Sequence, residues 1–427
     1  MKNVLIIGGG LAGLSAAVYL SKNNMNVTLV EATHKLGGKT YSFIDENSKY
    51  EIDNGQHIIL GCYQETIKYL RVISAFDKLK IPKEFSLNYL LPNFKIHRLK
   101  VSGYFYPFNL FCGFTKLELM DLDDKKNLLW FLLKIRFLDT EKIDNLNVKE
   151  WLELEKQTNK SVEIFWSVLC VGALNTSIEN ASAKLFCEVL KKIFWSNNNG
   201  YKFLLTENSL NDTFIRPAET FLLQHNVRIY KSEKVENVLL SGYEVKSVFT
   251  NKRKFDDYDF YIIAIPYHSI ESLNLPSLKN LYFRHSSILN VNFWLDNNPF
   301  VEPYYALVNS EVHWIFNKGN YINITISNAG KFIAMSKPEI EEVIKLELEK
   351  FIPGFSKRVI KSIIVKEKKA TFIQDNQTIN KRPSTRTSIK NLFLAGDWTD
   401  TKLPATIEGA IKSGRMAAES VINFQHY

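Results

Sequence analysis

Three glycines at fixed spacing stand near the start of the chain, between an apolar run and an alanine-rich stretch. Gly8, Gly10 and Gly13 come directly after residues 4–7 and before residues 14–20. In a strand–turn–helix unit, glycines in this pattern make a tight turn, let a pyrophosphate approach the backbone and let the helix pack on the strand. The start of such a helix offers N–H groups and a positive dipole end to phosphates. The spacing therefore predicts a phosphate-binding turn.

An acidic residue follows at the distance that a nucleotide ribose requires. Residues 27–30 form a second apolar run, which ends at Glu31, about 18 residues beyond Gly13. A carboxylate in this place accepts hydrogen bonds from the adenosine ribose hydroxyls. A purely structural glycine turn is the alternative, because a glycine cluster alone is weak evidence. The strand–turn–helix–strand context and the acid favour a dinucleotide site.

A second glycine pair, Gly37-Gly38, follows the acid and narrows the choice of dinucleotide. The pair resembles a motif of FAD-dependent oxidoreductases of the amine-oxidase and phytoene-desaturase superfamily, where it approaches the flavin pyrophosphate. That superfamily usually has arginine after the glycines, and this chain has Lys39. Lysine keeps the positive charge but loses the planar bidentate fork of arginine. The resemblance implies an FAD cofactor and a phosphate-facing role for Lys39.

The other end of the chain resembles the motif that closes the flavin site in the same superfamily. Residues 391–398 read as an apolar strand that runs into Gly396 and Asp397, and residues 403–410 lead into a helix of small residues. The resemblance implies that Asp397 bonds the ribityl chain of FAD and that the start of the helix faces the flavin. A turn or N-cap acid is the plainer reading of Asp397.

Two segments between these ends resemble further strands of the FAD domain. Residues 227–238 resemble the strand whose valine, here Val235, packs beside the adenine, with simple core packing as the alternative. Residues 259–266 resemble the strand that runs over the cofactor before the chain leaves the domain. No metal site is predicted. The predicted cofactor-binding residues are Gly8, Gly10, Leu11, Ala12, Gly13, Glu31, Ala32, Gly38, Lys39, Gly55, Gln56, His57, Val235, Gly396, Asp397, Ala405, Thr406 and Ile407.

A longer string carries a narrower resemblance. Residues 53–63 read DNGQHIILGCY, which is similar to the squalene-associated FAD-dependent desaturases, now understood as hydroxysqualene dehydroxylases. Further matches extend this resemblance over nearly the whole chain: residues 166–176, 181–190, 217–218, 396–400 and 403–410. Lys402 departs from the family, where glycine is common. We expect this difference to alter a loop without changing the chemistry.

The resemblance implies reductive removal of the allylic hydroxyl of hydroxysqualene, which gives squalene and oxidised flavin. The hydroxyl must be protonated to leave as water, aromatic faces stabilise the allylic cation, and reduced flavin supplies hydride from N5. His57 is the first candidate for the general acid, with a structural or flavin-contacting histidine as the alternative. Asp53 and Tyr63 are the other catalytic candidates. A structural carboxylate and a pocket-lining phenol are their plainer roles.

The middle of the chain is unusually apolar and aromatic. Residues 104–111 predict an aromatic loop, and residues 128–138, 164–174 and 186–195 predict apolar helices. Apolar side chains at helical spacing belong to the hydrophobic core more often than to a substrate tunnel. The large number of such side chains in this region nevertheless favours a deep pocket for a long apolar isoprenoid. The net charge of +9 and an exposed aromatic loop would suit docking at an anionic membrane surface. We therefore expect peripheral membrane contact.

The composition is typical of a folded protein with more than one lobe. The chain has 427 residues, of which 45% are hydrophobic and 13% aromatic, too many for one ordinary core. Its four cysteines form no CxxC pair, which predicts neither a zinc site nor a disulfide framework and fits a reducing compartment. With no signal peptide or spanning apolar run predicted, we expect a cytoplasmic protein, at most peripheral on the inner face of the cytoplasmic membrane. Upstream squalene-pathway enzymes are candidate partners, and nucleic acid is not.

Three other functions fit parts of this pattern. A carotenoid- or phytoene-type desaturase would run hydride transfer in the oxidative direction, which the residues do not distinguish. A flavin amine oxidase often carries a lysine near flavin N5 on the strand that corresponds to residues 286–293, where this chain has Asn290 and no lysine. A non-enzymatic flavin-binding or prenyl-carrier role is the alternative from a different class.

The expected fold is α/β: a discontinuous Rossmann-like FAD-binding domain with an inserted α+β substrate domain, as in amine oxidases and phytoene desaturases. The FAD-binding domain is assigned to residues 1–75, 212–270 and 371–427. The substrate domain is assigned to residues 76–211, which we expect to be mainly helical, and 271–370. Within the second insertion, residues 321–326 predict a strand and residues 338–351 predict a helix.

Overall fold

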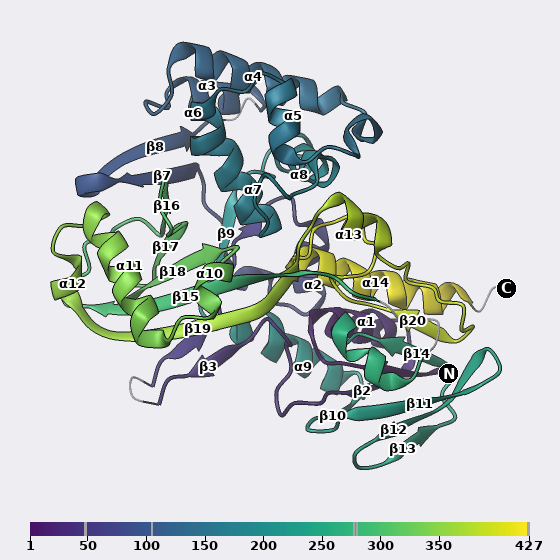
Figure 1. Ribbon diagram of the computed structural model, residues 1–427. Helices are drawn as coiled ribbons and strands as arrows, with labels where there is room; N and C mark the ends of the chain where they lie inside the picture. The colour runs from purple at the N-terminus through teal and green to yellow at the C-terminus, as the bar shows by residue number, and fades with distance from the viewer. Residues whose placement is uncertain (47–48, 104–105, 276–277, 279–280, 425–427) are drawn as a thin grey trace.

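The computed structural model describes residues 1–46, 49–103, 106–275, 278 and 281–424 (Figure 1). Tyr104 and Phe105 of the predicted aromatic loop lie outside the described residues. Two sheets dominate, and a layer of helices lies beyond the larger one (Figure 1). Among the described helices, none is both long enough and apolar enough to cross a bilayer.

A five-stranded parallel sheet forms the half that contains both ends of the chain. Its spatial order is β10 (Arg228–Tyr230), β2 (Asn26–Val30), β1 (Asn3–Ile7), β14 (Phe260–Ile263) and β20 (Leu392–Leu394). Strands covered on both faces read as continuous apolar runs, which explains the sequence of β1. Val4 and Ile6 pack toward the helices, and Leu5 and Ile7 pack toward a small antiparallel sheet.

Helices cover one face of this parallel sheet, and the small sheet covers the other. The helices are α1 (Leu11–Lys22), α2 (Gln64–Val72), α9 (Arg216–Gln224) and α14 (Ile407–Asn423). The small sheet is formed by β11 (Val235–Ser241), β12 (Glu244–Thr250) and β13 (Lys254–Asp256). The strand–turn–helix–strand unit predicted at the start of the chain is confirmed by β1, α1 and β2.

A seven-stranded sheet forms the second half. Its spatial order is β19 (Val359–Phe372), β15 (His285–Leu295), β18 (Tyr321–Ser327), β17 (Trp314–Asn317), β16 (Tyr304–Leu307), β7 (Phe85–Leu91) and β8 (Lys95–Val101). One face packs on α11 (Lys337–Phe351) and α12 (Phe355–Arg358), through Leu289, Val291 and Phe293 of β15. The opposite face is turned toward the first helical segment (Figure 1).

That helical segment consists of five main helices and a short one. They are α3 (Phe108–Thr115), α4 (Leu122–Phe137), α5 (Val148–Leu154), α6 (Asn159–Ser161), α7 (Ser167–Leu174) and α8 (Ala183–Trp195). Reciprocal hydrogen bonds between Asp121 and Asp124 begin α4, and the same arrangement of Asn147 and Glu150 begins α5. Such capping boxes satisfy backbone N–H groups that a helix start leaves free.

The other described strands and α-helices are short. They are β3 (Ser42–Ile44), β4 (Glu51–Asp53), β5 (Ile59–Leu60), β6 (Leu79–Lys80), β9 (Phe203–Thr206), α10 (Gly330–Ile333) and α13 (Asn376–Lys381). β5, β9 and β6 pair side by side in a separate three-stranded sheet.

Three predicted elements differ from the structure. The predicted strand at residues 227–238 is in fact two strands in different sheets. β10 pairs with β2 in the parallel sheet and ends at Tyr230, and β11 begins at Val235 and pairs with β12. The predicted aromatic loop becomes helix α3 from Phe108 onward, in which Leu110 is buried and Phe108 is exposed. The segment expected to be mainly helical also supplies β7 and β8, because β7 pairs with β16 from the later insertion. The domain boundaries themselves stay a prediction.

Candidate active site

One large cavity joins the two halves of the molecule, with a volume of about 1010 Å³. At one end it is lined by residues that directly follow β1, β2, β14 and β20, among them Gly8, Glu31, Ile265 and Asp397. Ligands of parallel α/β sheets bind at these carboxyl ends. At the other end the cavity passes between the seven-stranded sheet and helices α3, α7 and α8.

The glycine turn after β1 has the geometry of a phosphate cradle. A side chain at Gly8 would reach within 2.6 Å of the carbonyl oxygen of Ala264, and one at Gly13 within 1.9 Å of the carbonyl oxygen of Gly8. Gly10 differs, because the nearest atom to a Cβ there would be the Cα of Gly38, at 3.9 Å. Gly10 and Gly38 both line the cavity, whereas Gly13 serves the close packing of α1. The space beside Gly10 is therefore left for a ligand.

Glu31 is held in place at the end of β2. One carboxylate oxygen accepts the backbone N–H of Gly9 at 2.7 Å, and the other accepts the N–H of Thr33 at 2.7 Å and its hydroxyl at 2.9 Å. Glu31, Ala32 and Val235 all line the cavity. A carboxylate fixed beside a glycine turn fits the ribose contact that the sequence predicts.

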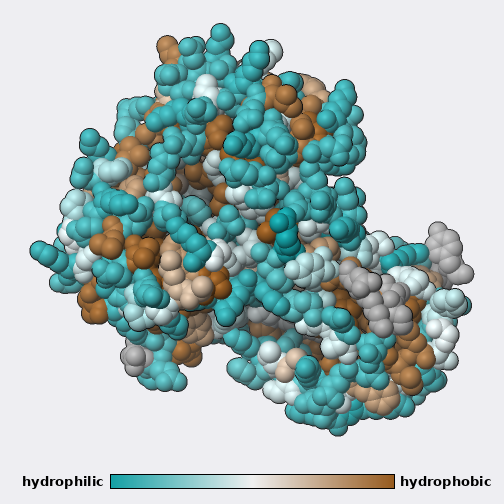
Figure 2. Space-filling model, in the orientation of Figure 1, coloured by the Kyte–Doolittle hydropathy of each residue, from teal (hydrophilic) through white to brown (hydrophobic). Residues whose placement is uncertain are grey.

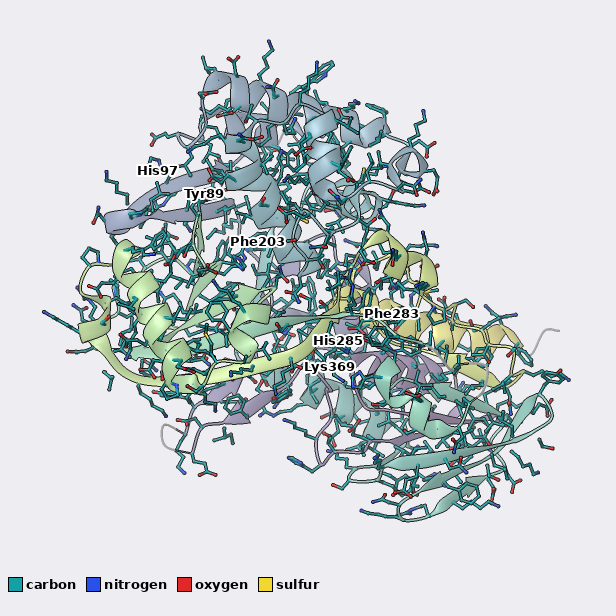
Figure 3. All side chains as sticks on the ribbon, in the orientation of Figure 1. Tyr89, His97, Phe203, Phe283, His285 and Lys369 are labelled. Atoms are coloured by element: carbon teal, nitrogen blue, oxygen red, sulfur yellow. The ribbon has the colours of Figure 1, made fainter. Side chains whose placement is uncertain are left out.

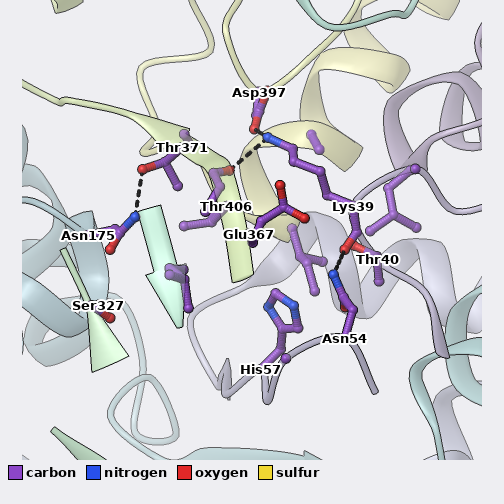
Figure 4. A pocket seen from close by; sticks show the side chains of 18 of the residues that line it. Lys39, Thr40, Asn54, His57, Asn175, Ser327, Glu367, Thr371, Asp397 and Thr406 are labelled. Atoms are coloured by element: carbon purple, nitrogen blue, oxygen red, sulfur yellow. Dashed lines mark hydrogen bonds and ion pairs between the residues drawn. The ribbon is translucent and has the colours of Figure 1, made fainter. Parts of the chain in front are cut away.

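Lys39 and Asp397, from opposite ends of the chain, meet in the cavity (Figure 4). The Nζ of Lys39 lies 2.5 Å from Oδ2 of Asp397 and donates a hydrogen bond of 2.9 Å to the carbonyl oxygen of Ala370. The backbone oxygen of Lys39 accepts a hydrogen bond of 2.7 Å from the side-chain amide of Asn54. The glycine pair, residues 54–57 and the C-terminal motif therefore form one wall of the cavity.

Asn54 carries an orphaned polar atom at this wall. The residue is buried and lines the cavity, and its Oδ1 has no hydrogen-bond partner among the described residues. A buried acceptor without a partner costs free energy, and a ligand that donates a hydrogen bond would satisfy it. The residues of this site therefore fit an FAD: Gly10 leaves space for the pyrophosphate, Glu31 is fixed for the ribose, and Asn54 offers a free acceptor.

His57 lines the cavity, on the same segment as Asn54, whose amide bonds the backbone oxygen of Lys39 (Figure 4). Burial, assisted by the positive charge of Lys39, lowers the pKa of His57 to about 4. The imidazole is therefore neutral near pH 7, so in this environment it does not store the proton that a general acid would donate. The geometry favours the flavin-contacting role that the sequence left open.

Tyr63 also lines the cavity, and its environment keeps it protonated. Burial raises the pKa of the Tyr63 phenol well above its ordinary value, and the phenol is hydrogen-bonded with Thr406 at the start of α14. Since Thr406 and Ile407 line the cavity as predicted, the phenol lies beside the expected flavin face. Tyr63 therefore lines the cavity with its phenol protonated at neutral pH.

Asp53 lies outside the cavity lining. Its Oδ1 accepts the hydroxyl of Ser42 at 2.7 Å and the backbone N–H of Leu210 at 2.8 Å, and burial raises its pKa. These contacts tie β4 to β3 and to the start of the segment that leads into α9. The geometry gives Asp53 a bracing role in place of the catalytic one considered from the sequence.

Several lining residues had no sequence signal. The Tyr267 hydroxyl lies 2.7 Å from Nδ1 of His285, and His268 stands beside that histidine with ring centroids 5.8 Å apart. Residues 366–372 of β19 also line the cavity, and Figure 3 shows Lys369 of this strand beside His285. They come from three separate segments, the turn at residues 267–269, β15 and β19, so no local spacing marks them. Only the apolar strand before Tyr267 was identified.

The far end of the cavity is aromatic. Its walls come from β7, β8, β9, β17 and helices α3, α7 and α8, and Figure 3 shows Tyr89 and Phe203 there. The aromatic residues that line it are Phe85, Tyr89, Phe114, Phe165, Phe194, Tyr201, Phe203, Trp314 and Phe316. Edge-to-face contacts order them, as between Phe85 and Phe203, whose centroids are 5.1 Å apart. This end suits a large hydrocarbon.

The lowered pKa of His57 predicts an effect of pH on stability. Below pH 6.5 His57 becomes protonated in the unfolded chain, whereas in the folded protein it stays neutral down to about pH 4. His57 therefore lowers the stability of the folded protein as the pH falls from 6.5 to about 4. We expect His57→Gln to lose less thermal stability than the parent protein between pH 7 and pH 5, measured by unfolding temperature. The matched control is His225→Gln, at an exposed histidine outside the cavity. An equal fall in all three proteins contradicts the assignment.

Comparison with known proteins agrees with this geometry. The family model described as flavin containing amine oxidoreductase matches residues 11–422. The chain belongs to this family. As a flavin-containing oxidoreductase it has FAD as its cofactor, which confirms the prediction made from the glycine motifs.

Relatives within this flavoprotein family support the narrower resemblance. The chain is 30% identical over 424 residues to a hydroxysqualene dehydroxylase from Zymomonas mobilis, with 98% of each chain covered. It is 28% identical to a hydroxysqualene dehydroxylase from Sinorhizobium fredii, with 99% of each chain covered. A 15-cis-phytoene desaturase from Glycine max is 22% identical over 98% of this chain and 79% of its own. The predicted resemblance to hydroxysqualene dehydroxylases is confirmed.

Solved structures show the same amine-oxidase fold. An oxidoreductase from Methanosarcina mazei has a TM-score of 0.74 at 15% identity and covers 98% of this chain and all of its own. A putrescine oxidase bound to putrescine has a TM-score of 0.71 at 14% identity, with 99% of each chain covered. These structures confirm the predicted fold class.

Proposed function

We propose that this flavoprotein is a hydroxysqualene dehydroxylase, which reductively removes the allylic hydroxyl of hydroxysqualene and yields squalene. The observation that carries the proposal is the single cavity, which joins the dinucleotide cradle at Gly10 to an aromatic chamber between sheet and helices. Full-length relatives bear that name. Bound FAD would supply the hydride chemistry.

The residues of the chain would bind the cofactor, exclude water and contact the departing hydroxyl. Gly10, Gly38 and the start of α1 would receive the pyrophosphate, with Glu31 on the ribose. The Tyr63 phenol, which lines the cavity, would donate a hydrogen bond to the departing hydroxyl. The aromatic faces of the chamber would stabilise positive charge on the allylic carbon and keep water from it.

A phytoene-type desaturase is the second candidate, because relatives of that name also match 98% of this chain. Amine oxidation is disfavoured, since β15 presents Asn290 to the cavity where a lysine would be expected. The test is a product analysis with three substrates: hydroxysqualene with chemically reduced enzyme, and phytoene or a primary amine with oxidised enzyme. We expect squalene from the first and no product from the others. Dehydrogenated polyene without squalene would favour the desaturase.

We further propose that the protein collects its substrate from a membrane through α4. This helix is apolar on two faces: Leu128, Phe131 and Ile135 are buried, and other apolar side chains of α4 point outward. Trp130 is 72% exposed, Leu133 38% and Phe137 81%. These side chains share one helical face, and Figure 2 shows hydrophobic groups on the surface of the upper lobe, interspersed with hydrophilic ones.

The position of this surface relative to the cavity supports the membrane proposal. Helix α3 packs beside α4, and Leu110 and Phe114 of α3 line the chamber while Phe108, at its start, is 70% exposed. Exposed basic side chains, Lys126 and Arg136, flank the apolar residues and would attract anionic lipid headgroups. Attachment to the inner face of the cytoplasmic membrane would also bring the protein close to the upstream enzyme that supplies its apolar substrate.

Replacement of Trp130, Leu133 and Phe137 together by serine should abolish most binding to liposomes that contain anionic lipid at low salt. The reason is that buried apolar area supplies most of the affinity of an interfacial helix. Cosedimentation measures the bound fraction. The matched control replaces Leu223, Leu239 and Tyr243, which are exposed on the other half of the molecule, and should bind like the parent. A parent protein that stays in solution with these liposomes contradicts the proposal.

A further inference from the structure

A row of polar side chains lies on the cavity-facing side of the seven-stranded sheet where the sheet borders the flavin site. Asn290 of β15 is directly opposite Thr325 of β18, and Thr325 is directly opposite Trp314 of β17. All three line the cavity. Beyond Trp314 the lining strands contribute mainly aromatic and aliphatic side chains. The change from polar to apolar therefore falls between β18 and β17.

Asn290 is fixed against the segment that the flavin is expected to contact. Its side-chain amide donates to the carbonyl oxygen of Asn54 at 3.3 Å, and a Cβ at Gly55 would come within 2.8 Å of that amide nitrogen. The absence of a side chain at Gly55 thus makes room for Asn290. This explains a glycine of the DNGQH string that has no role in the phosphate cradle.

Thr325 holds the carbonyl end of the Asn290 side chain. Its Oγ1 lies 2.9 Å from Oδ1 of Asn290 and 2.8 Å from Oδ1 of Asn323, so its single proton can go to either. Asn323 donates in turn to Oδ1 of Asn292 at 2.9 Å. All four side chains are buried. Such a network fixes the orientation of its members, because buried polar groups are costly unless they are paired.

The Asn290 amide still has a donor to offer. A carboxamide carries two N–H groups, and the contacts to the described residues use one of them, in a long hydrogen bond. Asn290 lines the cavity at the boundary between the expected flavin and the aromatic chamber. A side chain at this boundary would contact the middle of a long isoprenoid substrate, while one apolar arm of that substrate lies in the aromatic chamber.

We propose that Asn290, positioned by Thr325, binds the oxygen of the substrate hydroxyl and makes the protein select an isoprenoid alcohol over the corresponding hydrocarbon. The inference rests on the proposed function and deepens it, since it names the residue that recognises the feature by which hydroxysqualene differs from squalene. Asn290 is a binding residue, and Thr325 is a positioning residue that acts through it. A site built to hydrogen-bond a hydroxyl disfavours the analogue that lacks it, because its polar groups are then left unpaired.

The test measures equilibrium binding to the oxidised holoenzyme, in which no turnover occurs. Hydroxysqualene and squalene are titrated separately in detergent, and the perturbation of flavin absorbance reports binding. We expect the parent to prefer the alcohol by about 3- to 10-fold, the range of one neutral hydrogen bond. Asn290→Leu and Thr325→Val, which nearly preserve volume, should lower the affinity for the alcohol until this preference is lost. Their affinity for squalene should be unchanged or higher.

Tyr89→Phe is the matched control. It also removes a hydroxyl from the cavity lining, but Tyr89 stands on β7, separated from Asn290 along the sheet by β18, β17 and β16. It should keep the parent preference. A preference that survives in both Asn290→Leu and Thr325→Val, or that disappears in Tyr89→Phe alone, overturns the proposal. Equal weakening of both ligands in the variants also overturns it, because it indicates a packing role.

The outcome is separable from that of the proposed function. If the parent prefers the alcohol but reduced enzyme forms no squalene, the proposed reaction fails and the alcohol site stands. If squalene forms but the two variants keep the preference, the reaction stands and the role of Asn290 fails.

Discussion

Replacement of Gly10 by alanine should give a folded protein that is purified largely without flavin. A Cβ at this position meets no protein atom closer than 3.9 Å, so the fold accommodates it. The added methyl group would instead occupy the space that the pyrophosphate needs at the start of α1. Overpacking of this kind costs about 1–3 kcal/mol, which corresponds to roughly 5- to 150-fold weaker FAD binding. Titration of the apoprotein with FAD, followed by fluorescence quenching, measures the loss.

Gly13→Ala provides the contrast within the same motif. Its Cβ would lie 1.9 Å from the carbonyl oxygen of Gly8, a backbone atom that cannot move without displacing β1 or α1. We expect this variant to lose thermal stability even without FAD, whereas apo Gly10→Ala should unfold at the temperature of the parent apoprotein. Normal FAD affinity in Gly10→Ala would show that the cofactor does not use this cradle.

The second large effect is expected at Gly172, in helix α7 at the wall of the aromatic chamber. A Cβ there would lie 3.8 Å from Nε1 of Trp314, an ordinary contact. A phenylalanine ring at this position would extend into the chamber and take the space of an isoprenoid arm. We expect Gly172→Phe to lower kcat/KM for hydroxysqualene by roughly 5- to 150-fold, again from the cost of overpacking, while the amount of bound FAD stays normal.

Gly172→Ala is the control for helix and fold. It removes a helix-interior glycine, which favours the helix, and adds too little volume to obstruct the chamber. Its kcat/KM should stay close to that of the parent. Undiminished activity of Gly172→Phe would contradict the assignment of the aromatic chamber to substrate.

The nucleotide end of the site was predictable because its groups lie in continuous motifs. One strand–turn–helix–strand unit fixes the positions of Gly8, Gly10 and Glu31 relative to one another. The contact of Lys39 with Asp397 joins distant segments, yet each stands in its own recognisable string. The structure brings these strings to one wall of the cavity, as expected from the carboxyl-end rule for parallel sheets.

The substrate end could not be derived in the same way. Asn290 meets Thr325 through the register of two antiparallel strands, and Tyr267 meets His285 across separate elements, so no local spacing records either contact. The joining of β7 to β16 likewise depends on long-range pairing. Asp53 is a different case: the string in which it stands left both a catalytic and a structural role open, and its contacts with Ser42 and the Leu210 backbone favour the structural one.

The central claim is that this protein removes a hydroxyl reductively, with electrons from its flavin. The most direct measurement is an anaerobic single turnover in which dithionite-reduced holoenzyme, freed of excess dithionite, is mixed with hydroxysqualene. Flavin absorbance and extracted products are followed together. The account predicts one squalene formed for each flavin that regains its oxidised spectrum. A flavin that stays reduced with no squalene, combined with dehydrogenation of a polyene by the oxidised enzyme, would contradict it.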